Sequence, residues 1–466
     1  MSTWLKLCFR GVAALGFWLA MLVFIGAMVA CLCADVSMSA ALLAGFLCFL
    51  VVGLRRGYGA RSLAKMAAKG GKDAFSVVRV LALIGLITAS WRASGTIAFF
   101  IAKGVSLITP SLFILIAFAL SAVLSYALGT CFGVVGTVGV IFMALARSGG
   151  VNELIAAGAI LSGAFFGDRC APISSSANLI AGVTCTPIYD NVKYMHLTAL
   201  LPLGICTVAY GVLSALNPIG AVDTSALTLL SENFTLSWWT LIPAAIILVL
   251  PLCKVPVRYA IPASVFAAAV LALAVQHMPL GEFLRCCVLG YAAPDPALDH
   301  ILGGGGLISM LNVCFIVLLS GMLSGVFNGT GMLGGLQGII RPMEARIGGF
   351  PAMILTSIVI CAAFCNQTIA ITMNDQLWER IYEEEHASHR ELALDMENSA
   401  VLISGLVPWA ISCSVPLEML GVDARALPYG FLLYLVPLCY IFTKKIWFPP
   451  RRKRTVEAGA ETASAE

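Results

Sequence analysis

The sequence predicts an all-α polytopic membrane protein with about 10–13 membrane segments. Of its 466 residues, 60% are hydrophobic and 11% are charged, and the mean hydropathy is +0.96. Soluble domains carry roughly 25% charged residues, so this chain has too few charges to cover a water-facing surface. Apolar runs also recur from one end to the other. In lipid such runs form helices, because a helix satisfies its own backbone hydrogen bonds.

The distribution of charge predicts the topology. The first apolar run, Gly11 to Cys33, is long enough to cross a bilayer and longer than a typical signal peptide. Basic residues then crowd 55–72 and again 444–454. Lysine and arginine mark cytoplasmic loops, so both chain ends are expected in the cytoplasm. We expect a multi-pass protein of the bacterial cytoplasmic (inner) membrane.

These observations divide the chain into six parts. The two long central parts each contain polar interruptions, which is typical of the halves of a secondary transporter. The predicted parts are an N-terminal transmembrane hairpin (1–55), a basic cytoplasmic loop (56–76), a first transporter repeat (77–217), a loop (218–236), a second transporter repeat (237–446) and a basic tail expected to be disordered (447–466).

Polar residues interrupt the apolar runs at a few places. Polar groups in lipid are costly unless they are satisfied, so each interruption either ends a span or forms a working site. Non-helical backbone at membrane depth is tolerated where it is buried in protein or lines a cavity. The interruptions lie at 89–96, 129–139, 167–178, 364–376 and 395–409.

The break at 167–178 is the strongest candidate for an ion site. Asp168 ends an apolar run, and Pro172 prevents a continuous helix. Hydroxyl and amide side chains follow, which can replace the water around a hard cation such as Na⁺. They belong to Ser174, Ser175, Ser176 and Asn178. The alternative is an acid at a helix end that pairs with Arg169 in a loop.

A second break, Asn366, Gln367 and Thr368, resembles the first in its setting. Ala164–Phe166 precedes one break, and Ala363–Cys365 precedes the other, a little under half the chain later. This short match suggests two repeats that each supply a broken helix. The alternative is that the second break only caps a helix.

Other polar residues are weaker candidates. Thr130 and Thr137 flank glycines that recur every third residue, and these glycines favour close helix packing. The two threonines could still supply oxygen ligands. Glu397 and Asn398 begin an apolar run, where an acid can either favour a helix N-terminus or serve a site. Arg92 lies within an apolar stretch.

Several of these motifs together resemble one family. The stretch FFGDRCAPISSSANL resembles the signature of NhaC-type sodium/proton antiporters, and GTCFGVVGTVG, WRASGT, CNQT and ENSAVLISGLVPW resemble other segments of that family. The resemblance runs from about residue 50 to about residue 440 in matching order. It implies an ion-transporter fold of two inverted repeats with broken helices and re-entrant hairpins. Asp168, Ser174, Ser176, Asn178 and Asn366–Thr368 match its polar positions.

The sequence departs from the family pattern in two places. Ser175 stands where the family has an acid, and Cys131 and Phe132 stand where it has serine and tryptophan. Loss of a carboxylate removes one candidate proton carrier. Relatives of the family also move organic acids or amino acids, and Arg92 could then serve an anionic substrate group, or it could pair with Asp168.

The sequence therefore predicts a secondary active transporter that exchanges Na⁺ for H⁺ by alternating access. Asp168 would be the shared acid, with Na⁺ held by Asp168, Ser174 and Asn178. The alternative is a Na⁺- or H⁺-coupled carrier of a small organic acid or amino acid on the same scaffold. The expected partners are the bilayer and the transported ions or substrate, with a homodimer possible and no nucleic acid.

We expect neither a cofactor nor enzymatic activity. The Gly303–Gly306 run lacks the G-K-[ST] of a phosphate-binding loop. An intramembrane aspartyl protease is a third hypothesis, because Asp168 follows a glycine and Asp190 follows a tyrosine. It would require the two carboxyl groups to meet.

Overall fold

The computed structural model describes residues 20–448, except for 29, 32–33, 35–37, 108, 221–223, 254, 256, 294 and 331–336. Its described part is helical, and its β-structure is a single isolated bridge between Tyr291 and Gly304. This confirms the predicted all-α class. The start of the predicted N-terminal hairpin and nearly all of the basic tail lie outside the described residues.

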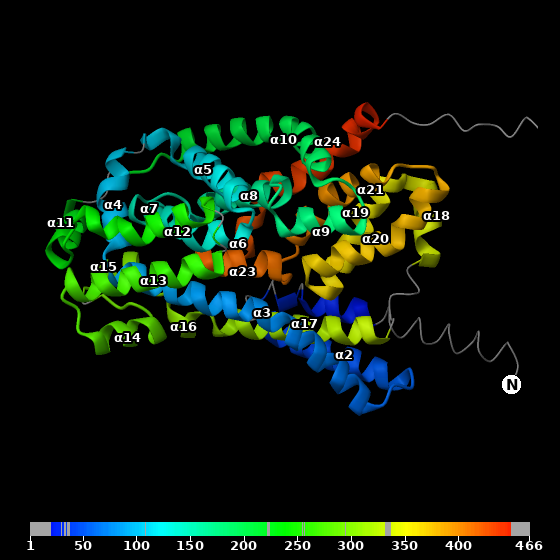
Figure 1. Ribbon diagram of the computed structural model, residues 1–466, viewed down its shortest axis with the longest axis horizontal. Coiled ribbons are helices and arrows are strands. Elements are labelled where there is room, and N and C mark those ends of the chain that lie inside the picture. Colours follow the sequence, from blue (N-terminus) through cyan, green and yellow to red (C-terminus); the bar gives the residue numbers. More distant parts are fainter. Residues whose placement is uncertain are drawn as a thin grey trace, which may run out of the picture.

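The helices form an elongated molecule, along which the chain runs back and forth (Figure 1). The first half contains α2 (Met38–Arg55), α3 (Ala60–Ala93), α4 (Thr96–Leu107), η1 (Pro110–Leu112), α5 (Phe113–Leu128), α6 (Cys131–Val134), η2 (Val135–Gly139), α7 (Val140–Ser148), α8 (Glu153–Cys170), α9 (Ser175–Val183), α10 (Ile188–Leu216) and α11 (Thr224–Asn233).

The second half continues with η3 (Trp238–Leu241), α12 (Ile242–Leu252), α13 (Val257–Ala274), α14 (Leu280–Leu289), α15 (Pro296–Leu302), α16 (Gly306–Ser309), α17 (Leu311–Thr330), α18 (Gln337–Ile347), α19 (Gly349–Phe364), α20 (Gln367–Glu384), α21 (His389–Met396), η5 (Glu397–Val401), α22 (Leu402–Ser404), α23 (Ile411–Leu420), η6 (Ala424–Tyr429) and α24 (Phe431–Trp447).

Several helices have the length and composition of membrane spans. Five pass this test singly within the described residues, and a bent pair within α3 makes a sixth. Five shorter apolar helices of 10–17 residues accompany them. The single spans are Pro110–Leu128, Cys131–Ser148, Glu153–Val183, Ile188–Leu216 and Leu311–Thr330. The protein is therefore a multi-pass membrane protein, and many of its apolar helices are too short to cross alone.

Glycines let the long helices approach closely. A Cβ at Gly163 would lie 2.4 Å from the carbonyl oxygen of Phe118, and one at Gly167 would lie 2.0 Å from the main chain of Ser125. These contacts join α8 to α5. Gly70 of α3 plays the same part against α17, where a Cβ would meet the carbonyl oxygen of Gly321 at 2.1 Å. Small residues at such crossings are the usual means of packing helices in lipid.

The helices of the two halves start at corresponding positions when Phe113 is aligned with Gly349. We call this alignment the shared register. Helix α19 then begins and ends in step with α5, and α20 begins in step with α6 and ends in step with α7. Helices α21 and α23 likewise begin in step with α8 and α9. In this shared register Asp168 corresponds to Ser404 and Cys131 to Gln367.

The short sequence match before the two breaks is therefore wrong as a guide to the repeat, because it would make Gln367 the counterpart of Asp168. The predicted boundaries of the repeats, and the opposite orientation of the two repeats in the membrane, stay predictions.

Each half breaks its first helix pair in the same way. Helix α5 ends at Gly129, which is left-handed (φ 65°), and the extended Thr130 starts α6. Helix α19 ends at Cys365, also left-handed (φ 55°), and the extended Asn366 starts α20. Left-handed backbone suits glycine and strains other residues, so this conformation at Cys365 reflects tertiary packing around it.

A second break follows in each half. Helix α8 ends at Cys170, and α9 restarts after Ser174; helix α22 ends at Ser404, and α23 restarts after Ala410. Pro172 lies in the first of these breaks, as predicted from its missing N–H. The breaks at 129–130, 171–174, 365–366 and 405–410 therefore form two matching pairs.

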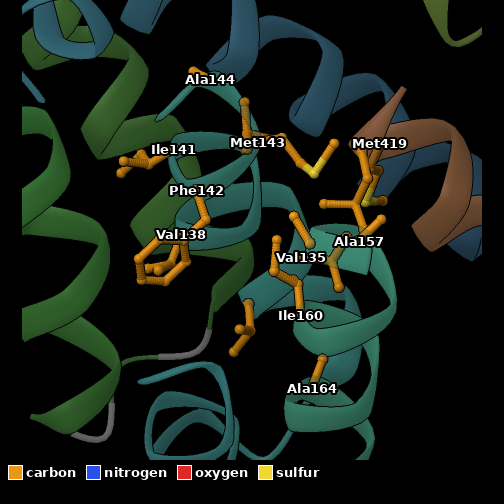
Figure 2. Packing of buried hydrophobic residues seen from close by; sticks show 14 of the residues in the cluster. Val135, Val138, Ile141, Phe142, Met143, Ala144, Ala157, Ile160, Ala164 and Met419 are labelled. Carbon is orange, nitrogen blue, oxygen red and sulfur yellow. The ribbon is translucent and has the colours of Figure 1, made fainter. Parts of the chain in front are cut away.

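The core around the first half is densely apolar. Val135, Val138 and Met143 of the segment η2–α7 pack with Ala157 and Ile160 of α8 (Figure 2). Met419 of α23 joins the same cluster (Figure 2). The Cys131–Ser148 segment is 83% buried inside the protein. Other helices therefore surround this segment on most sides. Its counterpart α20 differs, because several of its residues are exposed.

Candidate functional site

Asp168 lies in the last turn of α8, where both halves of the molecule meet. Only 7% of the residue is exposed. Gln367 Nε2, at the start of α20, donates to Asp168 Oδ2 at 3.3 Å, and the main-chain amide of Cys131, at the start of α6, also hydrogen-bonds to Asp168. One carboxyl group therefore faces the first residues of two corresponding helices. The short sequence match aligned Asp168 with Gln367. These two residues are not counterparts in the repeat, but they are in contact.

Two of the three serines close the break next to Asp168. Ser174 Oγ and Ser176 Oγ both donate to the carbonyl oxygen of Asp168, the latter at 2.7 Å. The two hydroxyls are 2.9 Å apart. Ser175 is exposed and lies outside this cluster. A carboxylate at position 175 would thus lie on the open face of α9, away from the buried serines.

The second half repeats this arrangement without the acid. Ser412 Oγ donates to the carbonyl oxygen of Ser404 at 2.8 Å. In the shared register Ser412 corresponds to Ser176 and Ser404 to Asp168. The repeat therefore preserves the serine that closes the break, while only the first half carries a carboxylate there.

The predicted asparagines stabilise helix ends. Asn178 Nδ2 donates to the carbonyl oxygens of Pro172 (2.8 Å) and Ser174 (2.7 Å), so its amide holds the break in place. Asn366 Oδ1 accepts from the main-chain N–H of Thr368 at 2.9 Å, which is N-capping. Thr368 itself is exposed. These contacts give Asn178 and Asn366 a structural part in the site.

Arg169 is almost fully buried, with 1% exposed, and it turns away from its neighbour Asp168. Arg169 Nη2 donates to Asn398 Oδ1 (2.6 Å) and to Thr198 Oγ1 (2.8 Å), and Nη1 donates to the carbonyl oxygen of Met195 (3.1 Å). The alternative of a simple Asp168–Arg169 pair in a loop is therefore wrong. The guanidinium instead ties α8 to α10 and to the segment after α21.

Glu397 brings a second acid into the same interior. It is fully buried, and neither of its carboxyl oxygens has a hydrogen-bond partner. Arg169 Nε and Asn398 Nδ2 also lack partners. A buried charge without partners is costly, so this carboxyl group requires a proton or a cation. Glu397 begins the π-helical segment η5, and such segments often occur at functional sites.

Three other predicted residues make no side-chain hydrogen bond to Asp168 in the described structure. Arg92 Nη1 donates to the carbonyl oxygen of Thr88 at 2.9 Å and lies beside Gly305, so the expected pairing with Asp168 is not formed. Thr137 Oγ1 donates to the carbonyl oxygen of Gly133 at 2.6 Å. Thr130 occupies the N-cap of α6 without a side-chain capping bond.

The aspartyl protease hypothesis fails on geometry. Asp190 is on the surface, with 52% of its side chain exposed, and it pairs with Arg390 at 3.1 Å. Asp168 is buried and faces Gln367. The two carboxyl groups therefore do not form a catalytic pair.

Sequence reasoning missed a polar cluster behind Glu397. Asp395 is fully buried and accepts hydrogen bonds from Tyr382 and from Tyr440 (3.0 Å). Lys444 of α24 contacts Asp395 and pairs with Glu391 at 2.9 Å. Acids in so charged a stretch of sequence are expected to be solvated, and Asp395 is not. The sequence did hold a signal for an acidic partner of Lys444. This lysine follows an apolar run within its helix, where a charge needs a partner.

The arrangement concentrates ionisable groups where water is scarce. Asp168 has an amide and a main-chain N–H to support its charged form, whereas Glu397 has neither. Arg169 adds one positive charge. In a medium of low dielectric, a charge change at one of these groups alters the others strongly. The cluster is therefore suited to binding a cation or a proton in competition.

Comparison with known proteins identifies similar chains. A protein-family model described as the Na⁺/H⁺ antiporter family matches residues 5–177 and 163–443. The Malate-2H(+)/Na(+)-lactate antiporter of Bacillus subtilis (strain 168) is 25% identical, over 91% of this chain and 93% of that protein. The Na(+)/H(+) antiporter NhaC of Alkalihalophilus pseudofirmus is 26% identical, over 80% of this chain and 82% of that protein.

A more distant activity is also represented. The Arginine/ornithine antiporter ArcD of Halobacterium salinarum is 26% identical, over 83% of this chain and 82% of that protein. The three relatives match nearly equally well. All three names describe antiporters, and they differ in the solutes that they name.

Proposed function

Because the chain belongs to the Na⁺/H⁺ antiporter family, we propose that it exchanges Na⁺ for H⁺ across the bacterial cytoplasmic membrane by alternating access. The sequence motifs, the helical fold and relatives named for this exchange support the proposal. We further propose that both chain ends are cytoplasmic. The observation that carries the mechanism is Asp168, a buried carboxyl group at the junction of two broken helices from the two halves.

Competition for Asp168 would couple the two ions. A carboxylate accepts either a proton or a cation, and in a buried site each form excludes the other. Na⁺ prefers oxygen ligands, and hydroxyls and main-chain carbonyls lie at the break: Ser174, Ser176 and the carbonyl oxygen of Asp168. Asp168 would then lose its proton as Na⁺ binds and regain a proton after Na⁺ leaves.

Glu397 and Arg169 set the charge of the site in this proposal. When Asp168 is ionised, the positive charge of Arg169 offsets its negative charge. These two groups alone would therefore attract a cation only weakly. An ionised Glu397 restores a net negative charge, whereas a protonated Glu397 removes it. Glu397 therefore acts as a second acid in the exchange, consistent with its unpartnered oxygens.

The test uses purified protein in liposomes that contain Na⁺ and a trapped pH dye. On dilution into Na⁺-free buffer, Na⁺ leaves and protons enter, so the lumen acidifies. Asp168→Asn should abolish acidification, because the amide cannot carry a proton in exchange. Asp190→Asn is the matched control: it removes an exposed carboxylate whose ion pair is worth little. Acidification by Asp168→Asn at the wild-type rate would contradict the proposal.

A second candidate function is exchange of a small organic acid or amino acid on the same scaffold. The observation favouring it is the pair of buried donors without acceptors, Arg169 Nε and Asn398 Nδ2, which a carboxylate could satisfy. One relative is named for malate and lactate and another for arginine and ornithine. Wild-type protein that is silent on Na⁺ alone, and active once one such solute is added, would favour this candidate.

A further inference from the structure

Helix α20 has an unusually polar face for a helix in this protein. Six of its polar residues fall within a sector of about 100° when placed at 3.6 residues per turn, whereas Gln367 and Glu384 lie outside this sector. Most of the remaining circumference is apolar, with Leu377 and Trp378 buried. We call this sector the polar face of α20; it consists of Thr368, Thr372, Asp375, Gln376, Glu379 and Glu383.

The polar face runs along α20 from Thr368, the neighbour of Gln367, to the exposed end of the helix. Gln367, whose amide contacts Asp168, is the first residue of α20, and Glu383 lies in its last turn. Thr368, Gln376 and Glu379 are exposed. Polar side chains at membrane depth face water or protein, because lipid cannot satisfy them. Wherever α20 lies at membrane depth, its polar face requires an aqueous space beside it.

Helix α9 lies beside α20 and also has an exposed side. It packs against α20, and the two lie next to each other in Figure 1. Ser175, Asn178 and Gly182 occupy one side of α9, and all three are exposed. Both helices thus present polar, open sides, and both begin at the breaks that hold Asp168 and Gln367.

The corresponding helix in the first half is closed. The segment Cys131–Ser148 is the counterpart of α20 in the shared register, and it is apolar and 83% buried. Gly139 occupies the position that corresponds to Asp375, and a Cβ there would lie 3.1 Å from Ile160 and from Leu420. Met143 occupies the position that corresponds to Glu379 and is buried in the apolar cluster (Figure 2). The two corresponding helices therefore share a register and differ in exposure.

Asp375 differs from the other acids on the polar face because it is buried. Only 8% of it is exposed, and its Oδ1 has no hydrogen-bond partner. Glu379 and His389 are the charged or titratable neighbours that act on it. It lies about two helical turns, or about 12 Å, along the helix from Gln367. A shielded carboxyl oxygen without a donor is a suitable ligand for an incoming cation.

We propose that the polar face of α20 lines the aqueous path to Asp168 in this conformation, and that Asp375 is an outer station on it for Na⁺. This rests on the proposed Na⁺/H⁺ exchange and adds the route by which the cation arrives. The route opens on the face that carries the start of α21 and the end of α24, which Glu391 and Lys444 join.

The experiment measures initial rates of Na⁺-driven acidification against Na⁺ concentration. Asp375→Asn should raise KM for Na⁺ about fivefold at low ionic strength, from the loss of one nearby charge, with the maximal rate within about twofold. The increase should shrink in choline chloride, because salt screens the attraction. Glu232→Gln, which removes an exposed acid on α11, should leave KM unchanged.

A second pair of variants tests the path without touching Asp375. Thr372→Lys should raise KM in the same salt-dependent way, whereas Thr372→Leu should raise it less, because only lysine repels cations. An unchanged KM for Asp375→Asn, or equal effects of lysine and leucine at 372, would overturn the inference. Wild-type protein without any Na⁺-driven flux would instead refute the proposed function.

Discussion

At the scale of single residues, the site depends on two neighbouring side chains that contact different partners. Asp168 and Arg169 are adjacent and both buried, yet they serve different partners. The acid faces Gln367, and the base holds Asn398 and Thr198. Separation of the pair leaves the carboxyl group available to an ion while the guanidinium organises the surrounding helices.

Glu397→Gln should stop exchange without unfolding the protein. Glutamine has nearly the same shape and carries no ionisable group, so the buried carboxyl group is lost and no cavity forms. We expect Na⁺-driven acidification to fall at least about tenfold, which corresponds to about 1.4 kcal/mol. The midpoint of thermal unfolding in detergent should stay the same or rise, since a buried unpartnered acid stabilises nothing. Loss of stability with normal transport would assign Glu397 a purely structural part.

Arg169→Lys should destabilise the protein. A lysine ammonium is a compact charge and cannot span Asn398 and Thr198 as the planar guanidinium does. We expect a loss of about 1–3 kcal/mol in the free energy of unfolding, the usual cost of leaving buried polar groups unpaired. Urea titration in mild detergent measures it. Arg425→Lys is the control, because Arg425 is exposed and its ion pair is with a neighbouring loop residue, Asp423.

At the scale of elements, close helix contacts position the two breaks. Helix α8 carries Asp168 and lies against α5, whose end leads into the break before α6. Gly163 and Gly167 make that contact possible. The position of Asp168 relative to Cys131 therefore depends on two residues that have no side chain to contribute.

Gly167→Ala should disrupt this contact. The added methyl group would lie 2.0 Å from the main-chain carbon of Ser125, so α5 and α8 must move apart. We expect a loss of at least about 1–3 kcal/mol from overpacking, together with loss of transport. Gly182→Ala on α9 is the control, because nothing lies within 4 Å of the new methyl group. It should be neutral or stabilise α9 by up to about 1 kcal/mol. Equal thermal midpoints for the two variants would contradict the argument.

At the scale of the whole molecule, the amino-acid composition was sufficient to predict an all-α membrane protein. It was not sufficient to predict how the helices of the two repeats correspond. Scarce charge predicted a helical membrane protein, and the polar breaks pointed to Asp168 and Gln367, which are in contact in the structure. The alignment of the two repeats could not be predicted from the sequence, because most corresponding positions carry different residues. Asp168 corresponds to Ser404 and Gly129 to Cys365, so backbone conformation is repeated at positions where the side chains differ.

Contacts between distant segments were the other unpredictable part. Nothing in the local pattern around Arg169 indicates Thr198 or Asn398, since such partners are chosen by the packing of α8, α10 and η5. Ser175 shows the reverse case. Its sequence position suggested a ligand, and the phase of α9 turns it outward. Helix phase across a break cannot be read from residue types, because Pro172 and its neighbours reset it.

Orientation is a prediction for the whole molecule. Basic residues at 55–72 and 444–454 favour the cytoplasm. A green fluorescent protein fused after Glu466 should therefore fluoresce, and alkaline phosphatase fused at the same place should be inactive, since the latter folds only outside. Active phosphatase at the C-terminus would reverse the assignment.

The shared register also bears on how such a chain arises. Two stretches of equal length, 113–183 and 349–419, start their helices in step, with no net insertion or deletion between them. This is the organisation that duplication and fusion of one ancestral gene produces. Once two copies are joined, each break exists twice, and one copy can keep the carboxylate while the other loses it. Asp168 in the first half, with Ser404 at the corresponding position of the second, is then the product of separate changes in two descendants of the same segment.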